Sequence, residues 1–170
     1  MPPIHYLPLL LLSLVAGQVL ANVEEGQRPP SYLGNTPDGQ QVQLSERQGK
    51  VVVATFWASW CGPCLKEMKV LEAIQRQVGK DRLEIVAINF KEGRRRYRAI
   101  VHKLKDFKVT FTHDVHGDLS KEFGVESIPN MFVINKAGLV VDHRIGYNEK
   151  GTGTLIDELN KLLTDPYPQS

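Results

Sequence analysis

The residues most able to carry chemistry are the only two cysteines of the 170-residue chain, Cys61 and Cys64, in the string WCGPC. A thiolate at the first cysteine can attack a substrate disulfide, and the second can then release the substrate by closing an internal disulfide. A purely structural bridge across so short a loop would constrain the chain little. A structural zinc site needs four ligands, and neither a second cysteine pair nor finger-like histidine spacing is present. The pair is therefore predicted to be redox-active.

The dithiol is predicted to lie between a buried strand and the start of a helix. Residues Val51–Trp57 form an almost unbroken apolar run, which is typical of a strand covered on both faces. Residues Gly62–Val78 have the pattern of a helix, with a proline near the start and Gly79 just beyond the end. The positive end of the helix dipole should lower the pKa of Cys61 from ~8.5 toward ~7 or below. Cys64, one turn further into the helix, should be more buried and keep a higher pKa.

The rest of the chain alternates strands and helices. A short hairpin is expected over 31–44, around the turn at Pro37–Gly39. Further strands are predicted at Leu83–Phe90, Val109–Thr112, Met131–Asn135 and Leu139–Arg144, and further helices at Arg94–Phe107, Leu119–Phe123 and Thr152–Leu163. Such alternation, ending in a hairpin, predicts a three-layer α/β domain with a central mixed sheet flanked by helices.

Composition and charge exclude several classes of protein. The chain is 42% hydrophobic and 24% charged, which suits one compact domain and excludes a disordered chain. There are 21 basic and 19 acidic residues, a formal net charge of +2. This balance gives no general attraction to nucleic acid or to membrane lipid, so no nucleic-acid partner is expected.

The N-terminal residues Met1–Ala21 are predicted to direct export. The apolar stretch Leu7–Ala16 has the length of a signal-peptide core, about 7–15 residues, although no Lys or Arg precedes it. Val19 and Ala21 fit a cleavage site for small residues. An uncleaved anchor is the alternative, although the run is shorter than the ~18–20 apolar residues of a membrane span. The mature chain would then comprise a flexible lead-in (22–30), one domain (31–164) and a tail (165–170).

Glu67 is predicted to be a buried carboxylate close to Cys64. At about 100° per residue, it falls within the apolar arc of its helix. That arc consists of Met68, Leu71, Ile74 and Val78. Removal from water should raise the pKa of Glu67 and suit it to exchange protons with Cys64. The alternative is a glutamate whose side chain extends to solvent.

The string FWASWCGPC at Phe56–Cys64 closely resembles the active site of the thioredoxin superfamily. Together with the preceding PDGQQVQLSERQGKVVVAT, it is similar to the exported TlpA/ResA-like thiol-disulfide oxidoreductases, over about 30–163. The resemblance implies a thioredoxin-like fold with an N-terminal hairpin and one inserted β–α unit between Cys64 and Pro129. It also implies that Pro129, in ESIPNMFVI, is a cis-proline that faces the dithiol.

The same resemblance implies roles for further residues. Substrate would lie against Trp60, Gly62, Pro63, Ile128 and Pro129, with an extended segment pairing with the backbone of Ile128. Trp60 would form an apolar shelf beside Cys61. The aspartate that ordinary thioredoxins place six residues before the first cysteine is Thr55 here, which leaves Glu67 as the nearby acid. A glutamate three residues after the second cysteine matches the ResA-like pattern.

The resemblance also implies a reductase that works without a cofactor in a bacterial periplasm. Gly-Pro between the cysteines and Ile before the proline match reducing thioredoxins. Oxidised exported proteins, such as apocytochrome c, would be its clients, and a membrane thiol reductase of the DsbD/CcdA type would supply its electrons. A disulfide oxidase or isomerase is one alternative. The other is a non-catalytic copper chaperone that uses Cys61, Cys64 and a histidine.

Two further features allow a functional and a simpler interpretation. The segment Lys91–Lys108 holds eight basic and two acidic residues, which could dock an acidic partner or simply form the solvated face of a helix. His113 and His116, with Asp114, could bind a metal ion, but two histidines without a further ligand are more typical of a surface loop.

Overall fold

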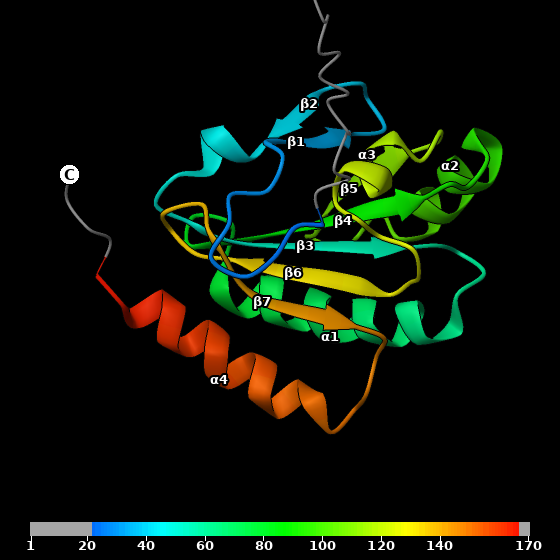
Figure 1. Cartoon of the computed structure of the whole chain (residues 1–170). Helices are drawn as coiled ribbons and strands as arrows, with labels where there is room; N and C mark the ends of the chain where they lie inside the picture. The colour runs from blue at the N-terminus through cyan, green and yellow to red at the C-terminus, as the bar shows by residue number, and fades with distance from the viewer. Residues whose placement is uncertain (1–21, 167–170) are drawn as a thin grey trace, which may run out of the picture.

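The computed structural model describes residues 22–166 and contains one seven-stranded mixed sheet of order β2-β1-β5-β4-β3-β6-β7 (Figure 1). The strands are β1 (Tyr32–Asn35), β2 (Gln41–Gln43), β3 (Val51–Trp57), β4 (Leu83–Phe90), β5 (Thr110–Asp114), β6 (Asn130–Ile134) and β7 (Val140–Ile145). The helices are the 3-10 helix η1 (Leu44–Arg47) and the α-helices α1 (Gly62–Val78), α2 (Arg94–Lys103), α3 (Asp118–Glu122) and α4 (Gly151–Thr164). The predicted signal segment and the residues beyond 166 lie outside the described part.

The central strand β3 positions the dithiol, which follows its last residue after a short turn. It runs parallel to β4 and antiparallel to β6, and all its side chains are buried. Val51, Val53 and Trp57 face one apolar core, whereas Val52, Ala54 and Phe56 face a second. This burial on both faces explains the almost unbroken apolar run that predicted the strand.

Helices cover the two faces of the sheet unequally. The first core packs the sheet against α1 and α4, which lie side by side below it in Figure 1, and against the half-buried side chains of α2. The second core lies under α3, the hairpin β1–β2 and the segment around Val23. The three-layer arrangement predicted from the sequence is therefore confirmed, as is the inserted β–α unit between Cys64 and Pro129.

The predicted bounds of β3, α1 and β4 agree with the structure, whereas the helix expected over Arg94–Phe107 was predicted too long. The helix α2 ends at Lys103. Leu104 and Phe107 lie in a turn after it, where the Phe107 N–H donates to Leu104 O at 2.9 Å. Both side chains still pack against the core, so the apolar spacing continues after the helix has ended.

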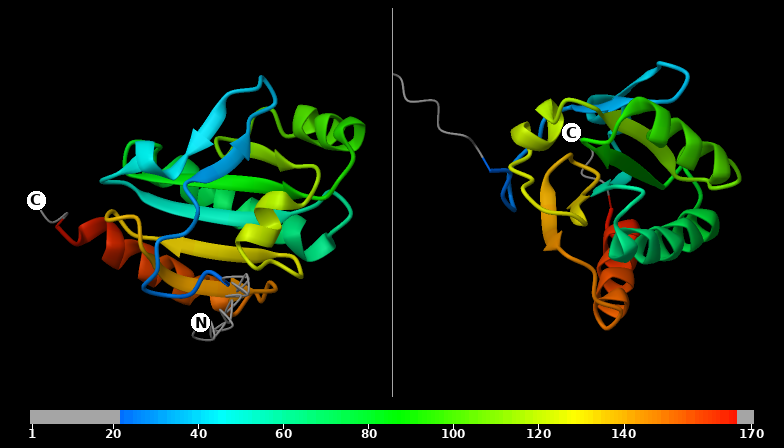
Figure 2. Two further views of the ribbon diagram at one scale, coloured as in Figure 1. Left: turned by 45° about the horizontal axis from the view of Figure 1, so that its top comes forward. Right: turned by 90° about the vertical axis from the view of Figure 1, so that its right-hand side faces the viewer.

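The segment 22–30, expected to be a flexible lead-in, contacts the start of β7. The Gly26 N–H donates to Val140 O at 2.8 Å, and the Val140 N–H donates to Gln27 O at 2.9 Å. Figure 2 shows this blue segment beside the orange strand. Val23 is buried in the second core, so this stretch covers part of an otherwise open sheet edge.

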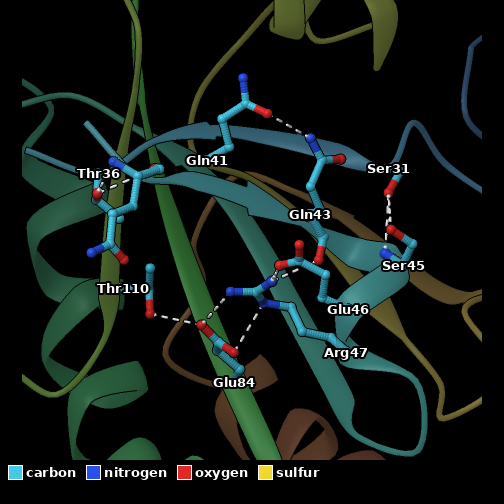
Figure 3. Close-up of polar contacts among 10 residues, drawn as sticks. Ser31, Thr36, Gln41, Gln43, Ser45, Glu46, Arg47, Glu84 and Thr110 are labelled. Carbon is cyan, nitrogen blue, oxygen red and sulfur yellow. Dashed lines mark hydrogen bonds and ion pairs between the residues drawn. The ribbon is translucent and has the colours of Figure 1, made fainter. Parts of the chain in front are cut away.

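A buried ion pair joins η1 to the sheet (Figure 3). Arg47 Nε lies 3.0 Å from Glu84 Oε2, and Arg47 Nη2 donates to Glu84 Oε1 at 3.3 Å. Thr110 Oγ1 on β5 donates to Glu84 Oε1 at 2.9 Å. The side chains of Arg47 and Glu84 are only 14% and 9% exposed. Burial removes most of the water around both charges, and the attraction between them compensates for that loss.

We expect Glu84→Gln to lower the free energy of unfolding by about 1–3 kcal/mol, because it leaves a largely buried guanidinium without its buried counter-charge. Urea denaturation of the oxidised protein measures this loss. The matched control is Glu46→Gln, since Glu46 contacts the same Arg47 at 3.4 Å but is 65% exposed. That control should cost at most about 0.5 kcal/mol. Equal losses in the two variants would show that burial of the pair is unimportant.

Candidate active site

Cys61 and Cys64 lie at the N-terminus of α1 and are joined by a disulfide with an S–S distance of 2.04 Å. A turn after β3 presents the first cysteine, and it is closed by the Cys61 N–H, which donates to Ala58 O at 3.1 Å. Cys61 is the N-cap residue of α1, and its Sγ accepts the Cys64 N–H at 3.2 Å. Cys61 is 6% exposed and Cys64 is fully buried.

This geometry makes the two sulfurs unequal. The first turn of α1 contains no acidic residue, so nothing within it offsets the positive end of the helix dipole. In the reduced protein, a thiolate at Cys61 would occupy the position where the helix N–H groups and the dipole stabilise negative charge. Cys64 lies within the apolar core, which favours its neutral thiol.

Pro129 lies at the same end of the sheet as the dithiol. The Ile128–Pro129 peptide bond is cis, as the resemblance implied. Asn130, the first residue of β6, pairs with Phe56 near the end of β3, so the preceding proline lies beside the loop that carries Cys61. The Pro129 carbonyl accepts the Gly146 N–H at 2.8 Å, which ties this loop to the segment after β7.

Two exposed apolar side chains belong to segments at this end of the sheet. Trp60 is 62% exposed directly before Cys61, and Ile145 is 65% exposed at the end of β7, opposite Asn130. The sequence indicated Trp60 but not Ile145. The sequence signal for Ile145 was its position at the end of the last strand, directly before a glycine. Only the pairing of β6 with β7 shows that it lies close to Pro129.

Glu67 is buried on the face of α1 that packs against the sheet, as predicted, and is only 4% exposed. Thr55 Oγ1 on β3 donates a hydrogen bond to Glu67 Oε2 at 2.8 Å. Burial raises the pKa of Glu67 to about 7, although the bond from Thr55 acts in the opposite direction. The carboxyl also borders a cavity of about 220 Å³, lined in part by Met131 and Tyr147. Glu67 can therefore hold or release a proton near neutral pH, about one helical turn from Cys64.

Two of the three residues considered for a metal ion, His113 and Asp114, have other partners, and the third, His116, is exposed. His113 Nε2 lies 2.7 Å from Glu92 O, and its ring stacks on Tyr97 with centroids 4.2 Å apart. Asp114 accepts the backbone N–H groups of Leu119 and Ser120 at 3.1 and 2.8 Å. Within residues 22–166, no group of three or more His, Cys, Asp or Glu side chains is placed to hold a metal ion. Nor does this part of the chain contain a helix long and apolar enough to cross a membrane.

The basic segment Lys91–Lys108 includes α2, whose charged side chains are exposed while Tyr97 is buried beneath them. Arg96 Nε lies 3.8 Å from Glu92 Oε1. This arrangement is that of a solvated helix face, the simpler of the two interpretations.

The fold and the cysteine pair define a thioredoxin-like thiol-disulfide oxidoreductase. The Redoxin family model matches residues 24–163, and the chain belongs to this family. It is 30% identical to the thiol-disulfide oxidoreductase ResA of Bacillus thuringiensis subsp. konkukian over 128 residues, 75% of this chain and 73% of the relative. It is 27% identical to the sporulation thiol-disulfide oxidoreductase A of Bacillus subtilis over 143 residues, 81% of this chain and 86% of the relative.

Solved structures show the same likeness. A putative thiol:disulfide interchange protein DsbE from Chlorobium tepidum superposes with a TM-score of 0.73 at 25% identity, covering 84% of this chain and 99% of that one. A putative protein disulfide isomerase from Bacteroides thetaiotaomicron gives a TM-score of 0.73 at 28% identity, covering 84% and 92%.

Proposed function

We propose that this protein is an exported reductase of protein disulfides, with Cys61 as nucleophile, Cys64 as resolving thiol and Glu67 as proton acceptor and donor. The observation that carries the proposal is the position of Cys61 Sγ, which accepts a backbone N–H at the N-terminus of α1, whose first turn contains no acidic residue. The buried neighbouring sulfur of Cys64 supplies the asymmetry that the reaction needs. The similarity to ResA and DsbE supports this assignment.

The reaction proceeds by two thiol–disulfide exchanges. The Cys61 thiolate attacks one sulfur of the client disulfide, which forms a mixed disulfide and releases the other client sulfur as a thiolate that takes up a proton. Glu67 then accepts the proton of Cys64, whose thiolate attacks Cys61 Sγ. The second client sulfur leaves and is protonated. The client gains two electrons and two protons, and the enzyme is left with the Cys61–Cys64 disulfide.

Client proteins are bound by the surface around the dithiol. Trp60 supplies an exposed apolar face, and Gly62 and Pro63 border the reacting sulfur from the first turn of α1. An extended client segment pairs with the backbone of Ile128 beside Pro129, in the manner of an added strand. Main-chain recognition of this kind admits many client sequences.

The proposed place of action is the bacterial periplasm or an equivalent cell surface, with Met1–Ala21 as a cleaved signal or an anchor. The similarity to the pneumococcal exposed lipoprotein thioredoxin Etrx1, with 27% identity and a TM-score of 0.60, supports an extracytoplasmic site. A reductase in an oxidising compartment must receive electrons from elsewhere. A membrane thiol reductase of the DsbD/CcdA type is the proposed donor, and oxidised exported proteins such as apocytochrome c are the proposed clients.

A redox titration against glutathione tests the direction of the reaction. We expect the Cys61–Cys64 pair to have a potential near that of reducing thioredoxins, about −270 mV. A value close to about −120 mV would indicate a disulfide oxidase instead. Stoichiometric copper binding by the reduced protein, without disulfide reduction, would indicate a copper chaperone.

A further inference from the structure

The turn that presents Cys61 is held by a buried carboxylate from the loop after β4. Ser59 and Trp60 are the central residues of this turn, between Ala58 and Cys61. Glu92 is only 3% exposed and accepts the Ser59 N–H on Oε2 at 3.1 Å. Its Oε1 accepts the hydroxyl hydrogen of the same serine. Both carboxylate oxygens therefore bind one residue, two positions before the proposed nucleophile.

Glu92 is itself fixed from the side of the sheet. Asn89, fully buried on β4, donates its Nδ2 hydrogen to Glu92 Oε2 at 2.9 Å. The Glu92 carbonyl lies 2.7 Å from Nε2 of His113 on β5, whose ring stacks on Tyr97. These contacts anchor the side chain of Glu92 to β4 and its backbone to β5, so Glu92 links the turn before Cys61 to two neighbouring strands of the sheet.

The carboxylate stays ionised at neutral pH. Burial by itself would raise the pKa of Glu92, but hydrogen bonds from Ser59 and Asn89, and the charge of Arg96, outweigh it and hold the pKa below its ordinary value. Hydrogen bonds to an ionised acceptor are roughly twice as strong as neutral ones. The turn is therefore held by charge-assisted bonds at the pH at which the protein works.

We propose that Glu92 is a positioning residue of the dithiol: through Ser59, it fixes the turn that keeps Cys61 Sγ at the N-terminus of α1. This inference rests on the proposed function. The effect of a helix dipole fades within one turn, so stabilisation of the Cys61 thiolate depends on where the turn places the sulfur. A loosened turn should raise the pKa of Cys61. The negative charge of Glu92 acts on the Cys61 pKa in the opposite direction. If only this charge mattered, its removal would lower the pKa of Cys61.

The test is the pH dependence of Cys61 alkylation by iodoacetamide in the reduced, full-length protein, resolved by mass spectrometry. Glu92→Ala should raise the midpoint by about one pH unit and slow alkylation at pH 7 about fivefold. Ser59→Ala leaves the carboxylate charge in place and should raise the midpoint by a smaller amount. Glu92→Gln keeps an acceptor oxygen and should also give a smaller rise. If Glu92→Ala does not fold, the proposal is tested by Ser59→Ala alone, which must still raise the midpoint of Cys61 alkylation.

Glu72→Ala is the matched control, because Glu72 is also a buried carboxylate that holds a loop. It is 6% exposed and accepts the N–H groups of Lys108 and Val109, at 2.6 and 3.3 Å. This variant should lose stability and leave the Cys61 midpoint unchanged. A lowered midpoint in Glu92→Ala, or lost stability with no shift, would overturn the role of Glu92. A wild-type protein without a low-pKa thiol would instead overturn the proposed function itself.

Discussion

Cys64→Ser should convert the enzyme into a trap for its clients, whereas Cys61→Ser should not bind them covalently at all. With Cys64 replaced, Cys61 still attacks the client disulfide, but no internal thiol can break the mixed disulfide. Turnover should fall about a thousandfold or more, because an intramolecular reactant of very high effective concentration is lost. With Cys61 replaced, the remaining thiol is fully buried in the structure and cannot reach a protein disulfide.

Acid quenching followed by non-reducing electrophoresis of the cell-surface fraction measures both outcomes. Each variant loses the same disulfide and keeps one thiol, so each is the control for the other. The adducts of Cys64→Ser, identified by mass spectrometry, would also name the physiological clients. Equal trapping by the two variants would show that both sulfurs are accessible, and the proposed order of attack would be wrong.

Glu67→Gln should make the oxidised protein more stable and less active above neutral pH. The folded protein holds the pKa of Glu67 at about 7, above the ordinary value of 4.5 that applies to the unfolded chain. A raised carboxyl pKa contributes stability below pH 4.5, and that contribution is lost as the pH rises through about 7. At pH 8 the glutamine variant, which has no charge to bury, should exceed the wild type by about 3 kcal/mol. The two should converge near pH 4.

Urea denaturation of the oxidised protein at these two pH values measures the difference, and the exposed Glu122→Gln is the control. In a separate assay, Glu67→Gln should slow release of the client from the mixed disulfide about a hundredfold, because Cys64 loses its proton acceptor. Greater stability with unchanged release would confirm that the carboxyl is buried and exclude it from the reaction. A Glu67→Gln variant no more stable at pH 8 than the control would contradict the raised pKa.

The elements around the dithiol were predictable because several signals agree there. The almost unbroken apolar run of β3 and the proline and glycine at the two ends of α1 define where these two elements begin and end. Where one signal stood alone, the prediction was less accurate. The apolar spacing of α2 continues into the following turn, where Leu104 and Phe107 still pack against the core.

The contacts that tune the site were not predictable in the same way. Periodicity placed Glu67 inside the fold, but its bond to Thr55 depends on how α1 lies across β3. Glu92 and Ser59 are 33 positions apart, and they meet because β3 and β4 pair in parallel and end at the same edge. A charged residue in a polar, basic segment gives no sign of burial in the sequence. Such contacts follow from strand register, which local patterns do not specify.

The ionisation of Cys61 can be measured most directly by alkylating the fully reduced wild-type protein across a range of pH and reading each cysteine separately by mass spectrometry. We expect Cys61 to react with a midpoint near pH 7 or below, at least about 1.5 units below that of a free thiol, while Cys64 remains unmodified. Two cysteines that react equally slowly at pH 7 would contradict it, because neither sulfur would then be available as the attacking thiolate.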